Sequence, residues 1–171
     1  MALTNSAGKE TISIKVADKD IFAILRTFKV MDKIASDDLR NVAQEIAVEV
    51  KNAIISNASF AQDKNGKDIS RQAIAVARSV KVERDRIPKI AIGGSSVVTS
   101  SGARAGTLVF GVEFGSYNKK NLPARSPKVG SGNSGYFIFP TLKIMQKTIS
   151  DKWVAGVDKI RDEWKGRVAN G

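Results

Sequence analysis

The residues of this chain that could do chemistry are few, and the most conspicuous is one glutamate. Glu113 is the only acid between Arg86 and Ser150, an interval that carries nine cations, and it lies in the apolar run Leu108–Phe114. One carboxylate is a poor magnesium site, because Mg²⁺ usually draws on several oxygens. We therefore expect a structural role, in which Glu113 pairs with a cation. Arg125 is the best candidate, since arginine can hold a carboxylate with two parallel hydrogen bonds.

The composition excludes the commonest catalytic machinery. The chain has no cysteine and no histidine. Disulfides, thiolate nucleophiles, Ser-His-Asp triads and histidine-based metal sites are therefore absent. We predict that the protein is not an enzyme and uses no cofactor or metal. A Mg²⁺-dependent nuclease is the alternative from the enzyme class, and it would need two or three carboxylates near the basic region.

Two short patterns imitate ligand-binding motifs. Residues 130–135 read Gly-Ser-Gly-Asn-Ser-Gly, which matches the dinucleotide fingerprint by letter. That fingerprint needs a strand before it and a helix directly after it, whereas here a basic loop precedes and an aromatic segment follows. Residues 63–68 faintly resemble a calcium loop but lack the closing glutamate. We interpret both segments as ordinary loops.

The net charge of +11 favours a polyanionic partner. Cations with no nearby acid occur in two glycine-rich stretches, at 103–106 and 116–132; they are Arg104, Lys119, Lys120, Arg125 and Lys128. Facing DNA, they would neutralise phosphates without reading bases. The alternative is that they are solvated loop side chains. We favour the first interpretation and see no helix-turn-helix or zinc-finger pattern.

Apolar periodicity predicts the elements that position these residues. The clearest is a helix from Ser36 to about Asn57, about 33 Å long at 1.5 Å per residue. We also expect a short helix within 18–28, a helix over 69–80, strands at 11–16, 89–92, 108–114 and 136–139, a flexible connection at 93–106, and a helix from Pro140 onward. Trp153 and Trp164 share one face of that last helix and are expected in the core or in a subunit contact.

These elements predict one α+β domain over residues 1–171. We expect a small, mostly antiparallel β-sheet, with the long amphipathic helix and the C-terminal helix packed on one face. Residues 1 to about 10 are expected to form a loose arm, and residues 166–171 a frayed tail. No signal peptide is visible, and no apolar run approaches the roughly 20 residues that cross a bilayer. We therefore expect no membrane contact and synthesis in a cytoplasm-like compartment.

Three motifs in order carry a family resemblance. They are Val112-Glu113-Phe114-Gly115, then Pro123-Ala124-Arg125 in a basic loop, then the aromatic segment Tyr136–Pro140 before the last helix. The chain resembles the neck and tail-completion (head–tail joining) proteins of long-tailed phages with non-contractile tails. There a strand commonly ends in a Val-Glu-Phe-Gly-like run, and an Ala-Arg-Pro-Phe-like stretch leads into the last helix.

The chain also departs from that pattern. Its basic loop is longer, and Ser126 and Pro127 follow Arg125, so the Arg-Pro-Phe step is interrupted. The Pro-Val-Arg-Thr-Gly-like turn that often follows the long helix is missing, and residues 63–67 stand in its place.

The resemblance implies a structural virion protein with no catalytic residues. It would form a homo-oligomeric ring, which we expect to have six subunits, as a connector, tail-completion or tail-terminator subunit at the head–tail joint. Implied partners are head portal or adaptor proteins, tail tube proteins and viral DNA in the lumen, after synthesis in the host cytoplasm. The alternative is a free, sequence-nonspecific nucleic-acid-binding protein that uses the same basic loops.

Overall fold

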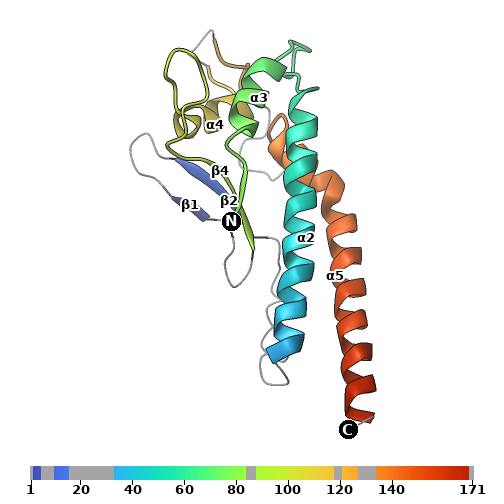
Figure 1. Cartoon of the computed structure of the whole chain (residues 1–171). Coiled ribbons are helices and arrows are strands. Elements are labelled where there is room, and N and C mark those ends of the chain that lie inside the picture. The colour runs from blue at the N-terminus through green and yellow to red at the C-terminus, as the bar shows by residue number, and fades with distance from the viewer. Residues whose placement is uncertain are drawn as a thin grey trace.

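The computed structural model describes residues 2–4, 10–15, 33–83, 88–117, 121–126 and 134–169. A small sheet and two short helices form one part of the fold, and two long helices run side by side and project beyond the sheet (Figure 1). In chain order the elements are β1 (Ala2–Thr4), β2 (Thr11–Lys15), α2 (Lys33–Ala58), α3 (Ser70–Ala77), β3 (Lys81–Glu83), β4 (Lys89–Gly93), α4 (Ala105–Phe114) and α5 (Ile138–Ala169). This confirms the predicted α+β class.

The sheet is antiparallel, with strand order β1-β2-β4-β3. Ile12 lies opposite Ile92, and Ile90 lies between Ile14 and Val82 on the flanking strands. Because alternate side chains of a strand share a face, these five form one apolar face. They join a single core with side chains of α2, α3 and α4, which confirms that helices pack on one face of the sheet. The C-terminal helix was expected on that face too, but α5 packs against α2 instead of the sheet.

The two long helices form a closely packed pair. Trp153 of α5 is buried, so this tryptophan belongs to the core. A Cβ added at Gly156 would lie 2.5 Å from Cγ1 of Val42, so glycine permits the close approach of α5 to α2. The side-chain amide of Asn57 donates to the hydroxyl of Thr141 at 2.8 Å, near the start of α5.

The predicted strand at 108–114 is wrong, because the segment is the helix α4. A short, continuous apolar run is compatible with a buried strand or a buried helix, and periodicity cannot separate them. Here Ala105, Val109 and Val112 are all buried. Gly106 lets the start of α4 approach the main chain, since a Cβ there would lie 2.7 Å from the carbonyl oxygen of Glu10.

The predicted strand at 136–139 is also wrong. Tyr136 and Phe137 form a bend, and α5 begins at Ile138, with Pro140 in its first turn as expected. The long helix is confirmed, but it begins at Lys33, so Ser36 lies inside it. Within the expected N-terminal arm, β1 pairs with β2, and at the other end α5 continues to Ala169. The short helix expected within 18–28 falls outside the described residues.

Candidate functional site: a buried junction at the start of α5

The N-terminus of α5 is capped by a side chain from α4. The first N–H groups of a helix lack partners within the helix and need acceptors. The Oε2 atom of Glu113 accepts the main-chain N–H groups of Phe137 at 3.2 Å and Ile138 at 3.0 Å. Its Oε1 atom accepts the N–H of Phe139 at 2.9 Å. One carboxylate therefore joins two helices that a basic loop separates in the sequence.

The expected pair between Glu113 and Arg125 is wrong. Glu113 is fully buried, whereas Arg125 is exposed and its guanidinium lies over the ring of Tyr117, 4.8 Å from the centroid. The partners of Glu113 are main-chain N–H groups at the start of α5, not the arginine side chain. The residue types in a sequence do not show where such N–H groups will lie. One signal was available: Pro140 indicates a helix start whose N–H groups need an acceptor, and Glu113 is the only acid nearby in the sequence.

Burial controls the acidity of this carboxyl group. Burial raises the pKa of Glu113 from 4.5 to about 7, while the N–H donors of Phe139, Ile138 and Phe137 oppose that rise. The rings of Phe114 and Phe139 stand 5.4 Å apart between centroids at the same junction. Phe114 also stacks on Phe110. The carboxylate is therefore buried against the start of α5, and an aromatic pair joins the end of α4 to the first turn of α5.

Main-chain bonds attach the loop at 115–126 to the end of α4. The N–H of Ser126 donates to the carbonyl of Phe114 at 2.7 Å, and the N–H of Ser116 donates to the carbonyl of Pro123 at 2.9 Å. Gly115 has φ 73°, and a Cβ there would lie 2.1 Å from the carbonyl oxygen of Ala124. Glycine at this position therefore meets both a backbone and a space requirement.

The same loop is tied to the start of α5. The N–H of Gly135 donates to Oγ of Ser126 at 3.1 Å, and the hydroxyl of Tyr136 donates to the carbonyl of Ala124. Gly135 has φ 119°, and a Cβ there would lie 2.0 Å from Oε1 of Glu113. Ser126 and Gly135 were not singled out as site residues from the sequence, and both hold the junction together.

Asp63 extends the junction to the turn at 63–68. Its Oδ1 accepts the N–H groups of Asn65 at 2.8 Å and Lys67 at 3.0 Å, and its Oδ2 accepts the N–H of Ala124 at 3.2 Å. Its carboxylate therefore organises a turn and a loop, in agreement with the interpretation of 63–68 as an ordinary loop.

The candidate channel cations do not form one described cluster. Arg104 is exposed at the base of a hairpin, where it bridges to Val97, and it immediately precedes α4. Arg125 lies in the junction loop. Lys119, Lys120 and Lys128 fall outside the described residues. The hairpin is more ordered than the expected flexible connection, because the N–H of Val98 donates to the carbonyl of Ala103 at 2.9 Å.

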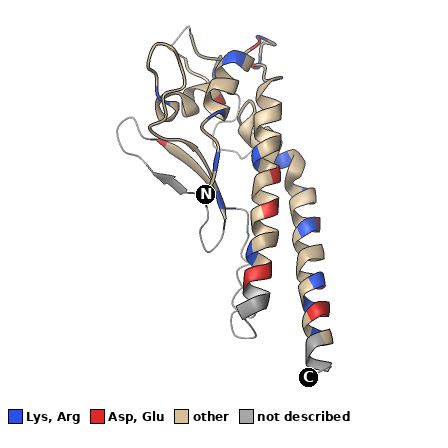
Figure 2. Ribbon diagram, in the orientation of Figure 1, with Lys and Arg blue, Asp and Glu red and all other residues tan. Residues whose placement is uncertain are grey.

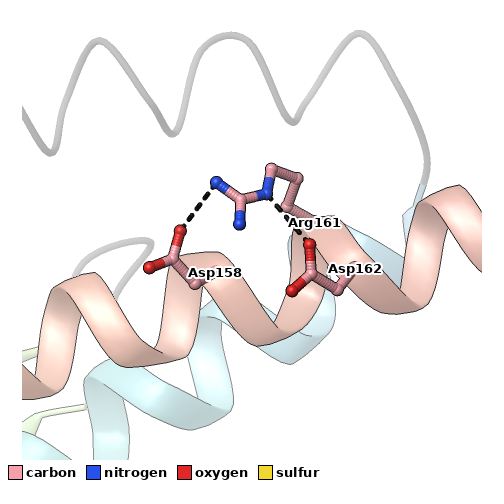
Figure 3. A network of polar contacts seen from close by, with 3 residues as sticks. All are labelled: Asp158, Arg161 and Asp162. Carbon is pink, nitrogen blue, oxygen red and sulfur yellow. Dashed lines mark hydrogen bonds and ion pairs between the residues drawn. The ribbon is translucent and has the colours of Figure 1, made fainter.

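The remaining charged side chains offer little chemistry. Side chains of both charge signs occur along α2 and α5 (Figure 2). On α5, Arg161 lies between Asp158 at 2.8 Å and Asp162 at 3.1 Å, and all three are exposed or partly exposed (Figure 3). Surface ion pairs of this kind contribute little to stability. The described part of the chain holds no group of three or more His, Cys, Asp or Glu that could bind a metal ion.

No protein-family model, curated protein or solved structure matches this chain. Across the described residues, no helix has both the length and the apolar character needed to cross a bilayer.

Proposed function

We propose that this chain is a structural subunit of a phage particle, working in a ring at the head–tail joint. One observation carries the proposal: the three segments behind the family resemblance meet at one buried junction. Glu113, in the first segment, caps the start of α5, which lies in the third segment. Ala124, in the second segment, lies against Gly115 of the first, and its carbonyl accepts a hydrogen bond from the hydroxyl of Tyr136 in the third. Motifs that meet in space act as one structural unit.

The chemistry of that junction favours assembly over catalysis. All the described hydrogen bonds of Glu113 come from main-chain N–H groups, and its side chain is fully buried. A general base must reach the proton that it removes. A capping carboxylate instead holds two helices in one orientation, which is a property that a ring subunit needs.

The long helices carry apolar side chains that the monomer leaves exposed. On α5, Ile144 is 75% exposed and Val154 is 59% exposed. On α2, Val48 and Ile55 are exposed and lie seven residues apart, so they share a side of the helix. A head-to-tail ring needs two different contact surfaces on each subunit, and these helix faces are the candidates.

The charge supports passage of DNA through such a ring. The chain carries a formal charge of +11, and both described candidate cations, Arg104 and Arg125, are exposed. Contact with phosphates alone would let DNA pass whatever its sequence. A free nucleic-acid-binding protein would have the same charge, but it would not need the neck location.

Imaging tests the proposal directly. Negative-stain images of the purified protein, alone and with head portal or tail tube proteins, should show rings, which we expect to be six-fold. Antibodies against the protein should label the head–tail joint of particles whose genome encodes it. Particles labelled elsewhere, or necks without such a ring, would exclude the proposed location.

A further inference from the structure

A groove lies away from the junction, between α3, the hairpin at 97–104 and α4. Its volume is about 1050 Å³. Much of its lining is aliphatic, from Ile74, Ala75, Val98, Leu108, Val112 and Leu122. Hydroxyl groups also line it, from Ser70, Thr99, Ser100, Ser101 and Thr107. An apolar cavity with a few polar groups is the usual form of a binding site.

The charged side chains that line this groove are all positive. Arg71 and Arg78 line it, and no aspartate or glutamate does. They are seven residues apart on and just after α3, so they lie on the same side, about 10 Å apart along the axis. Both are exposed, and neither forms an ion pair with a carboxylate in the described part of the chain. An anionic partner fits these two side chains.

Gln72 adds a further polar side chain to the lining of the groove. The amide N–H of Gln72 donates to the carbonyl of Asn121, but its buried Oε1 atom accepts no hydrogen bond. A buried acceptor without a donor is costly.

We propose that this groove binds an acidic peptide segment of another protein in an extended conformation. Its carboxylates would pair with Arg71 and Arg78, and its aliphatic side chains would lie on the apolar lining. Single-stranded nucleic acid fits less well, because its bases stack on aromatic side chains and none lines the groove. The inference does not rest on the proposed head–tail function.

A short peptide of alternating residues tests the chemistry. In the extended peptide Glu-Leu-Glu-Leu-Glu, the leucines share one face and the outer glutamates are about 13 Å apart, close to the spacing of the arginines. Fluorescence anisotropy of the fluorescein-labelled peptide measures its binding to the full chain. Binding should be lost when lysine replaces glutamate in the peptide, and it should weaken when serine replaces leucine.

Matched variants locate the binding. Arg71→Glu and Arg78→Glu should each weaken the affinity by about tenfold or more, because each sets a like charge against the peptide. Lys165→Glu makes the same charge change at an exposed position of α5 and should leave the affinity unchanged. Ala75→Gln should also weaken binding by filling the groove. Circular dichroism and melting curves show whether each variant is folded.

Three results would overturn the proposal. The first is failure of the acidic peptide to bind, or equal binding of the lysine peptide. The second is binding of a labelled oligothymidine to the wild-type chain but not to Arg71→Glu or Arg78→Glu, which would assign the groove to nucleic acid. The third is loss of ring formation in the same two variants, which would assign it to a second copy of the chain. Rings that persist while peptide binding is lost would support the peptide site and leave the head–tail proposal standing.

Discussion

Glu113 illustrates how far a buried carboxyl group can move from its ordinary acidity. Burial favours the protonated form, whereas the main-chain N–H donors at the start of α5 favour the carboxylate. The balance leaves the pKa at about 7, above its ordinary value of 4.5. The folded chain therefore holds this proton more tightly than the unfolded chain does, and that difference links the pH to the stability of the fold.

We expect the free energy of unfolding to fall as the pH rises from about 4.5 to about 7, because the folded state binds more protons in that window. The stability lost through Glu113 across this range should total about 3 kcal/mol. Above the range, Glu113 should cause no further change in the free energy of unfolding. Urea unfolding at several pH values measures it. Glu113→Gln cannot take up this proton and should show a flatter dependence. Equal slopes in both proteins would contradict the assignment.

The second prediction at this scale concerns the cap itself. At pH 8.5, where the carboxylate is charged, Glu113→Gln should lower the free energy of unfolding by about 1–3 kcal/mol, because an amide group cannot accept all three N–H donors. Arg125→Gln should change it by less than about 0.5 kcal/mol, as expected for an exposed side chain.

The double variant separates the cap from the ion pair expected from the sequence. Since Glu113 and Arg125 share no contact, their effects should add in thermal and urea unfolding. If the effect of the double variant differed from the sum of the two single effects, an interaction between Glu113 and Arg125 would be shown, which would contradict the structure. Ring formation, followed by native mass spectrometry, should respond to Glu113→Gln more than to Arg125→Gln.

At the scale of elements, the contact between α2 and α5 depends on a residue without a side chain. Gly156 lies against Val42, and an added Cβ would come within 2.5 Å of Cγ1 and 3.0 Å of Cγ2. Alanine is normally the better helix former by about 1 kcal/mol. The two effects oppose each other, and a contact this short requires the helices to move apart or Val42 to shift.

We expect Gly156→Ala to destabilise the fold by about 1–3 kcal/mol in urea unfolding, because overpacking outweighs helix propensity here. Gly166→Ala is the matched control, since nothing lies within 4 Å of a Cβ there. It should be neutral or stabilising by up to about 1 kcal/mol. Adding Val42→Ala should recover part of the loss at Gly156. A stabilising effect of Gly156→Ala alone would show that the helices are not closely packed at this point.

At the scale of the whole molecule, charge is the property that connects the fold to its proposed surroundings. The surplus of +11 belongs to the whole chain, and the candidate channel cations are Arg104 and four residues that follow α4 in the sequence. If they face DNA in a ring, contact is electrostatic and blind to sequence, and each contact releases counterions.

DNA binding by the assembled protein should therefore weaken steeply with salt and equally for unrelated sequences. Replacing Lys119, Lys120, Arg125 and Lys128 with glutamine should reduce the slope of log affinity against log salt by up to about 4. The control replaces four lysines of α5, Lys147, Lys152, Lys159 and Lys165, and should leave the slope unchanged. Filter binding measures both, and equal slopes would show that the loop cations do not contact DNA.

Much of the fold could be predicted because its signals are local. A stripe of apolar residues at helical spacing predicted α2, and Ile12 and Ile14, alternating with polar residues, predicted β2. Pro140 correctly indicated the first turn of α5. In each case the pattern reports which side of one element is buried, and a single stretch of sequence contains that information.

The sequence by itself therefore determined the α+β class, the long helices, the one-sided sheet and the charge. Tertiary structure alone decided the rest. The run at 108–114 is buried as a helix, and a continuous apolar run has no period that distinguishes the two forms. Glu113 caps α5, because its partners are main-chain N–H groups that only folding brings to it. The groove beside Arg71 likewise exists only where α3, the hairpin and α4 meet.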